Sequence, residues 1–383
     1  MNNSQPYMLK QLVLYFLRLG SSGFGGPPAL IGYMHRDLVE KKKWIEEDDY
    51  KEGLALAQLA PGPLAAQLAI YLGYVHYRIA GATLAGIAFV LPSFIMVVLL
   101  GIAYTRFGGL PWMQAVFYGI SASVIGIIAF SSYKLTKKSI GNNILLWCIF
   151  GIAAIVTIIT RSENVLLFIG AGVVYWLIKV PPKFSAVLNS FALLPFFLLQ
   201  VPAITSNEKL VKLFLFFAKA GAFVFGSGLA IVPFLYGGVV KENGWLNEQQ
   251  FLDAVAVAMI TPGPVVITVG FIGYLVAGFP GAVVAALATF LPCYLLTILP
   301  APYFKKYGRN PALRAFVEGV TAAAIGAIAG AVVILGTKSL IDFVTVAMAL
   351  ITVVVLWKFK KIQEPVIIVI AAVIGLVLKY KTL

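Results

Sequence analysis

The chain has 383 residues, of which 61% are hydrophobic and 11% are charged, and its formal net charge is +14. Soluble domains carry about 25% charged residues, so this composition excludes an ordinary soluble protein and indicates one whose solvent is the lipid bilayer. The positive charge does not indicate nucleic acid binding, because the Lys and Arg residues lie mostly in short loops between apolar segments, where they mark membrane topology.

The chain opens with two apolar segments that are interrupted by glycine and proline. GSSGFGGPP at 20–28 interrupts the first segment, and APGP at 60–63 interrupts the second. Proline lacks an N–H group and glycine relaxes the backbone, so together these residues end helices. We therefore expect broken or re-entrant helices here rather than two plain spans.

Uncharged apolar stretches follow, and each is close to the roughly 20 residues that a membrane-spanning helix needs. They occupy 84–104, 113–133, 144–160 and, later in the chain, 282–303. A further apolar stretch at 184–204 supplies an unpaired crossing. The predicted fold class is an all-α polytopic membrane protein.

The second half of the chain repeats the first at a nearly constant offset. The PGP motif at 61–63 recurs at 262–264 with an offset of 201 (262 − 61), and the offset becomes 200 further on. Other pairs in this register are Phe24 with Phe225, Trp44 with Trp245, Gly73 with Gly273, and Pro92 with Pro292. We therefore divide the chain into an N-terminal repeat at 1–183, a connecting transmembrane segment at 184–204 and a C-terminal repeat at 205–383.

The distribution of Lys and Arg over equivalent loops indicates that the two repeats have opposite orientations, because short cytoplasmic loops are enriched in these residues. The loop near Arg106 has one basic residue, whereas its counterpart near Arg309 has several. Conversely, the three lysines at 134–138 face a counterpart with only Lys338. We expect two inverted-topology repeats, an arrangement found in many secondary transporters.

Broken helices near the midplane are the best sequence indication of a transport site. A break leaves backbone N–H groups free at the start of the second half-helix, and the helix dipole adds positive potential there. Such ends bind anions, so breaks at matched positions predict an oxyanion site without a metal or cofactor. Its predicted members at the breaks are Gly25, Gly26, Pro61, Gly62, Pro63, Gly226, Gly228, Pro262, Gly263 and Pro264.

Two pairs of polar side chains at equivalent positions complete the candidate substrate site. Arg18 and Lys219 are matched cations within apolar segments, where charge is costly and usually functional. The alternative is that their head groups extend to the membrane interface. Gln67 and Thr268 follow the PGP motifs and can donate hydrogen bonds to an oxyanion, or they hold neighbouring helices together.

Glu52 and Asp253 are a matched pair of acids, each nine residues before its PGP motif (61 − 52 and 262 − 253). That separation is roughly 13 Å along a helix. They are candidates for proton coupling. The alternative is that an acid in the first turn of a helix only favours the helix dipole.

Longer segments around these motifs are also distinctive. They read FGGPPALIGYMHRDLVEKKKWI and QLAPGPLAAQ in the first repeat, and WLNEQQFLDAVAVAMITPGPVVITVGFIGYLVAG with FLP in the second. In these segments, and over almost its whole length, the chain resembles the chromate ion transporter family. The resemblance implies transport of chromate through a site for sulfate-like oxyanions, and it leaves sulfate or another oxyanion open as the physiological substrate.

The leading interpretation is a secondary transporter driven by an ion gradient, with the proton as candidate coupling ion, because the chain has no GxxxxGK[ST] loop for ATP. A passive oxyanion channel is the alternative, and it needs a continuous pore. A membrane enzyme finds no support in a metal cluster or a nucleophile with its base. We expect a multi-pass protein of the plasma membrane of a prokaryote, with an oxyanion and the bilayer as partners and with no nucleic acid. A homodimer is left open.

Overall fold

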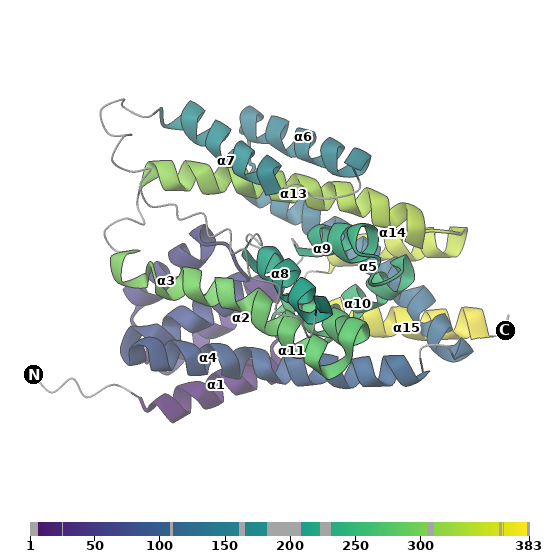
Figure 1. The fold of residues 1–383 in the computed structure, drawn as a ribbon, viewed down its shortest axis with the longest axis horizontal. Helices are drawn as coiled ribbons and strands as arrows, with labels where there is room; N and C mark the ends of the chain where they lie inside the picture. The colour runs from purple at the N-terminus through teal and green to yellow at the C-terminus, as the bar shows by residue number, and fades with distance from the viewer. Residues whose placement is uncertain are drawn as a thin grey trace, which may run out of the picture.

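The structure is a computed structural model that describes residues 7–24, 26–107, 110–160, 165–181, 208–222, 231–304, 310–359, 362 and 364–380. Within these ranges the chain forms helices and no strands, so the predicted all-α fold is confirmed. The long helices run approximately along the long axis of the molecule (Figure 1).

A helical hairpin opens the chain. It joins α1 (Leu9–Ser22) to α2 (Gly26–Met34), which continues as the π-helix η1 (His35–Lys41). The hydroxyl group of Tyr15 on α1 donates to the carbonyl oxygen of Tyr33 on α2 at 3.2 Å. The two arms therefore lie side by side, and the hairpin turns at the glycine-rich break.

A second hairpin follows and turns at the first PGP motif. It joins α3 (Glu47–Leu59) to the start of α4 (Leu64–Phe107). A Cβ atom built on Gly53 of α3 would lie 2.3 Å from the ring of Tyr71 on α4, so these arms are also in contact. With 13 residues, α3 is about 20 Å long and cannot cross a hydrocarbon core of about 30 Å.

α4 reverses its direction at Arg78, whose φ of 49° and ψ of −138° are not helical. Along a straight helix Gly73 and Gly81 would be about 12 Å apart. In the structure a Cβ atom on Gly73 would lie 2.3 Å from the carbonyl oxygen of Gly81. The chain therefore folds back between these glycines, and neither position has room for a side chain.

The second half has the same order of elements. α8 (Glu208–Ala222) corresponds to α1, α9 (Ile231–Leu235) with the π-helix η4 (Tyr236–Glu242) to α2 and η1, and α10 (Glu248–Ile260) to α3. The short 3-10 helix η5 (Val265–Ile267) and α11 (Thr268–Ile298) correspond to α4. α11 has its own break at Gly278, and a Cβ atom on Gly273 would lie 2.3 Å from the carbonyl oxygen of Gly281.

The remaining helices complete each half. They are α5 (Pro111–Ser139), α6 (Ile144–Thr160) and α7 (Val165–Lys179) in the first half, and the short η6 (Ala301–Tyr303), α13 (Pro311–Ser339), α14 (Phe343–Lys358) and α15 (Glu364–Tyr380) in the second. Among the described residues, four helices are long and apolar enough to cross a membrane, over Leu64–Phe107, Pro111–Ser139, Val265–Tyr303 and Pro311–Ser339.

The outer faces of the long helices are apolar, as expected for contact with lipid. α4 exposes Ile87, Leu91, Ile95 and Leu99, and α11 with the residue that follows it exposes the equivalent Leu287, Leu291, Leu295 and Leu299. Their spacing of four residues places each set toward one side of its helix. Continuous exposed apolar surface of this kind marks a membrane-integral protein.

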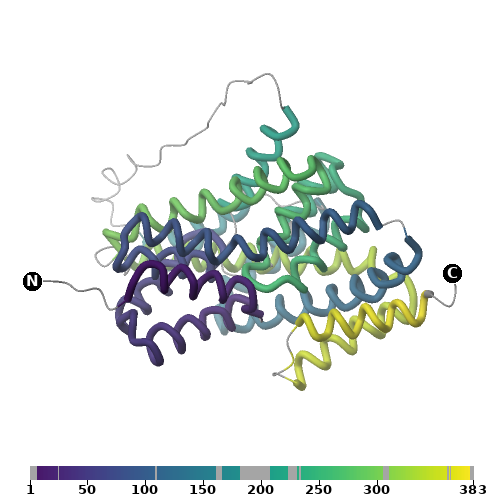
Figure 2. The backbone as a smooth tube through the Cα atoms, turned by 90° about the horizontal axis from the view of Figure 1, so that it is seen from below, coloured from purple at the N-terminus to yellow at the C-terminus, as the bar shows by residue number. Residues whose placement is uncertain are grey.

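The two halves exchange their last helices. α6 and α7 pack against α13 (Figure 1), and α14 and α15 pack against α5 (Figure 2). Glycines allow these helices to approach closely, as small residues commonly do in membranes. A Cβ atom on Gly119 of α5 would lie 2.0 Å from the carbonyl oxygen of Ala371, and one on the equivalent Gly319 of α13 would lie 2.6 Å from that of Ala171.

We predict that Gly73→Ala lowers the free energy of unfolding by about 1–3 kcal/mol, because the new methyl group meets a backbone carbonyl in a packed interior. Gly170→Ala on α7 is the control, since a Cβ atom there meets nothing within 4 Å. That control should be neutral or stabilising by up to about 1 kcal/mol, because alanine is the better helix former. Thermal unfolding in detergent measures both, and equal stability of the two variants would contradict the close crossing.

Candidate functional site

Hairpin tips from both halves meet at one small cavity, which we call the tip cavity. It is lined by Pro27, Leu30, Pro63, Leu64, Ala65, Gly263, Pro264, Val265 and Val266. Three predicted breaks are thus brought together, from the start of α2, the start of α4 and the break before α11. The cavity is about 10 Å³, which is the scale of a single water molecule. Since its side chains are apolar, its polar atoms belong to the backbone.

Hydrogen bonds between the halves hold the second PGP tip in place. The N–H group of Gly263 donates to the carbonyl oxygen of Gly23 at 2.9 Å. The hydroxyl group of Ser93, on α4, donates to the carbonyl oxygens of Pro262 at 2.7 Å and of Gly20 at 3.3 Å. Ser93 is fully buried, so its hydroxyl group can hydrogen bond only within the protein.

The first PGP tip satisfies the equivalent carbonyl group in a different way. The amide nitrogen of Gln67 donates to the carbonyl oxygens of Pro61 at 2.9 Å and of Ala60 at 3.3 Å. The repeat partner of Ser93 is Cys293 (293 − 93 = 200), whose thiol is a weak donor. The carbonyl group before each PGP glycine is therefore capped by its own hairpin in the first half and by the opposite half in the second.

The central glycine of each PGP motif is required by its backbone and its surroundings. Gly62 has φ of 142° and Gly263 has φ of 90°, in a region that disfavours side chains. A Cβ atom on Gly62 would lie 3.1 Å from the sulfur of Cys293, and one on Gly263 would lie 2.1 Å from the hydroxyl of Ser93. Residues 93 and 293 thus each face the PGP glycine of the opposite half.

Gln67 and Thr268 are both buried, and both already donate hydrogen bonds to backbone groups. The hydroxyl group of Thr268 donates to the carbonyl oxygen of Val265 at 2.8 Å. Among the described residues, the side-chain oxygen of Gln67 has no hydrogen-bond partner. In this conformation neither side chain has a donor free for an oxyanion, so that role remains a prediction.

None of the charged candidates lines the tip cavity. Arg18 and Lys219 are exposed on α1 and α8, and Arg18 is five residues before Gly23, about 8 Å along the helix. Glu52 is partly buried on α3, and Asp253 is buried on α10. Their roles in transport remain predictions.

Among the glycine candidates, Gly26 begins α2 with φ of 68°. Gly25, Gly226 and Gly228 lie outside the described residues, and so does the predicted connecting segment 184–204.

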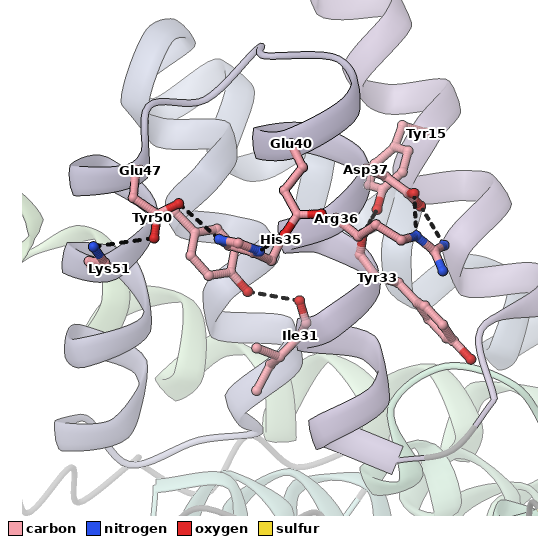
Figure 3. Close-up of polar contacts among 10 residues, drawn as sticks. All are labelled: Tyr15, Ile31, Tyr33, His35, Arg36, Asp37, Glu40, Glu47, Tyr50 and Lys51. Atoms are coloured by element: carbon pink, nitrogen blue, oxygen red, sulfur yellow. Dashed lines mark hydrogen bonds and ion pairs between the residues drawn. The ribbon is translucent and has the colours of Figure 1, made fainter. Parts of the chain in front are cut away.

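A polar cluster lies away from the tips, where η1 meets α3 (Figure 3). His35 contacts Glu47 at 2.9 Å through Nε2 and Glu40 at 3.1 Å through Nδ1. Hydrogen bonds from His35 and Lys51 hold the pKa of Glu47 below its usual range. The hydroxyl group of Tyr50 donates to the carbonyl oxygen of Ile31 at 2.8 Å. The cluster therefore ties the first hairpin to the second.

The second half has an equivalent cluster with different side chains. Tyr236 stands at the position of His35 and donates to Glu248, the partner of Glu47, at 2.9 Å. Lys241 replaces Glu40 and also donates to Glu248, at 2.8 Å. The second half thus makes the same connection between hairpins with a positive Lys241 where the first half has the negative Glu40.

The sequence analysis did not single out Ser93, Tyr104 or Gln249, although all three contact the elements of the candidate site. Ser93 directly follows the matched Pro92. A polar residue next to a proline in an apolar helix could therefore have indicated it. Tyr104 contacts Asp253 from the opposite half, at 2.7 Å. No regularity of spacing relates two residues that are so distant in the chain.

The long apolar helices and the hairpins that meet inside the bundle define a membrane transport protein. The chromate transporter family matches residues 10–176 and again residues 211–376, so the chain belongs to this family. Its members are transport proteins and not enzymes, and membership implies an anionic substrate. The resemblance that the sequence analysis stated is thereby confirmed.

Two of the relatives that match nearly the full length of the chain are at least 64% identical to it. The chromate transport protein of Cupriavidus metallidurans is 67% identical over 98% of this chain and 94% of its own length. The probable chromate transport protein of Synechococcus elongatus is 64% identical over 97% of this chain and 96% of its own length. No solved structure matches the chain.

We predict that Ser93→Ala destabilises the protein by about 1–3 kcal/mol, the cost of leaving a buried polar group unsatisfied. Hydrogen–deuterium exchange at the 262–264 tip should also become faster. Thr297→Val is the matched control, because the hydroxyl group of Thr297 is buried but donates only within its own helix, to Cys293. If Ser93→Ala leaves both stability and exchange as they are in the control, the proposed link to Pro262 is wrong.

Proposed function

We propose that the chain is a secondary transporter that carries chromate across the plasma membrane of a prokaryote and holds the oxyanion at the hairpin tips. The observation that carries this proposal is the meeting of three helix breaks, from both halves, at the tip cavity. The names of both relatives, as chromate transport proteins, support chromate as the substrate. Sulfate, which is also a tetrahedral dianion, is the second candidate.

Backbone groups are the natural ligands at this place. α4 begins at Leu64, directly after its PGP motif, and the three-residue η5 begins at Val265 after the other and continues directly as α11. The first N–H groups of a helix lack partners within that helix and lie at the positive end of its dipole. Two such starts line one cavity, which supports binding of an oxyanion without a cofactor.

The closed tips support a carrier rather than a channel. A cavity of about 10 Å³ has no room for a tetrahedral oxyanion, so the tips must separate before the substrate enters. The bonds from Gly263 to Gly23 and from Ser93 to Pro262 are those that must break. A carrier opens and closes in this way in each cycle, whereas a channel needs a continuous pore.

We also propose that the halves are inverted repeats, with boundaries at 1–183, 184–204 and 205–383. The reversed distribution of Lys and Arg supports this proposal. The reciprocal packing of α6 and α7 on α13, and of α14 and α15 on α5, supports it independently. Two such halves around a central site are the usual basis of alternating access.

Reconstituted proteoliposomes test the transport class and the substrate together. We expect an imposed proton gradient to drive accumulation of radiolabelled chromate above its external concentration, and excess sulfate to reduce the rate. Purely downhill flux that carries current would indicate the passive channel instead. If excess sulfate leaves the rate of chromate accumulation unchanged, a shared oxyanion site is excluded.

We predict that Arg18→Gln and Lys219→Gln each raise the apparent Km for chromate about tenfold, which corresponds to roughly 1.4 kcal/mol. A cation about 8 Å from a dianion contributes about 1–4 kcal/mol at effective dielectric constants between 80 and 20. Lys212→Gln is the control, because Lys212 is exposed on the same helix as Lys219 and pairs with Glu208. A Km equal to that of the control in both variants would remove these cations from the site.

A further inference from the structure

Asp253 is the one buried residue among the Asp, Glu, Lys, Arg and His side chains of the described part, with 3% of its surface exposed. It lies on α10, nine residues before Pro262 (262 − 253) at the tip. An unpaired carboxylate in such surroundings is costly, and a buried group commonly avoids the cost by taking up a proton. Acids that are buried inside membrane proteins commonly belong to proton pathways.

The partners of Asp253 are all neutral. The hydroxyl group of Tyr104 donates to Oδ2 at 2.7 Å, and the amide nitrogen of Gln249 donates to Oδ1 at 2.8 Å. No ion pair of the described residues includes Asp253. Several charged groups near α10 have other partners. Glu248 pairs with Lys241 and Lys338, and Glu364 at the start of α15 interacts with Lys134.

This arrangement accepts a proton at one particular oxygen. An amide N–H₂ group can only donate, so Oδ1 must remain an acceptor toward Gln249. A hydroxyl group can rotate and either donate or accept. A proton therefore binds at Oδ2, where a new O–H bond forms and the hydroxyl hydrogen of Tyr104 turns away. Gln249 is itself exposed, so one partner of the buried carboxyl group reaches the surface.

The same pair of helices also holds the second PGP tip. Tyr104 and Ser93 both lie on α4, while their acceptors are Asp253 within α10 and Pro262 at the tip that follows α10. The two bonds together fasten this arm to the opposite half. A proton on Asp253 exchanges the charge-assisted bond from Tyr104 for a weaker neutral one, so protonation loosens the contact between α4 and α10 that keeps the tip closed.

The first half lacks this arrangement. Glu52 is only partly buried, and Phe304, which has no hydroxyl group, stands at the repeat position of Tyr104 (304 − 104 = 200). The exposed Asp48 stands at the repeat position of Gln249 (249 − 48 = 201). Glu52 interacts instead with Tyr71 of its own hairpin.

We propose that Asp253, Tyr104 and Gln249 form the binding site for the coupling proton, and that this site exists in the second half only. The proposal rests on the proposed transport of chromate. It assigns the proton to one of two acids that are equivalent by sequence position. It also states how protonation affects the substrate site, through the single arm that connects Asp253 to the tip.

The test separates proton coupling from substrate exchange in proteoliposomes. Counterflow exchanges radiolabelled chromate for unlabelled chromate and needs no net proton movement. We expect Asp253→Asn to retain counterflow and to lose at least about tenfold in accumulation driven by a proton gradient, within the usual range of coupling between two sites. Glu52→Gln, the matched change in the other half, should keep its accumulation within about twofold, below that range.

Each outcome decides one claim. If the parent protein shows no counterflow, the proposed function fails and the proton site fails with it. If the parent exchanges chromate but Asp253→Asn still accumulates it, or if Glu52→Gln is equally impaired, only the assignment to Asp253 is overturned.

Tyr104→Phe provides a second test that does not depend on how well Asp253→Asn folds, because phenylalanine already stands at the equivalent Phe304. Removing this hydroxyl group takes one hydrogen bond from the carboxylate but leaves a place for the proton. We therefore expect the pH profile of accumulation to shift toward higher pH, since the charged form loses stabilisation. An unchanged pH profile would overturn the proposal.

Discussion

A helix that ends inside a bilayer leaves backbone groups that lipid cannot hydrogen bond, and each unsatisfied group costs several kcal/mol. The two PGP breaks impose this constraint at Pro61 and Pro262. Gln67 caps the first carbonyl group, Ser93 caps the second, and Gly263 donates to Gly23 across the halves. The second break is therefore satisfied only when the hairpins of both halves are assembled. The breaks at which we propose that the substrate binds thus also make each half depend on the other.

Close helix packing makes that assembly compact. Gly73 and Gly273 allow sharp reversals directly after the half-helices, and Gly119 and Gly319 allow α5 and α13 to receive helices from the opposite half. In a membrane such contacts contribute through dispersion and through the short approach of backbones rather than through expulsion of water. α5 and α13 each pack against helices of the opposite half. Neither half by itself therefore holds all the helices that contact its own long helix.

Much of the fold could be predicted from the sequence, because composition and broken helices leave local signals. The all-α membrane fold follows from the apolar stretches, and both PGP motifs end helices as expected. The partners at the tips could not be predicted in the same way. Ser93 and Pro262 are far apart in the chain, and only the packing of α4 against α10 brings them together. The sequence analysis began a new apolar stretch at 84 but did not predict the sharp reversal at Arg78, six residues earlier (84 − 78).

The polar residues at the two tips differ between the halves, and this difference affects the relative free energy of the two end states of a transport cycle. If two halves exchange roles during transport, identical halves would produce two end states of equal free energy. In the structure Ser93 donates to Pro262, and a bond from Cys293 to Pro61 would be its equivalent in the other half. A thiol is the weaker donor, and the carbonyl group of Pro61 already has Gln67. A net hydrogen bond is worth about 1 kcal/mol, or roughly a fivefold preference. Within the proposed carrier, this difference favours the arrangement in which the second tip is fastened, and the proposed proton site lies on the same arm.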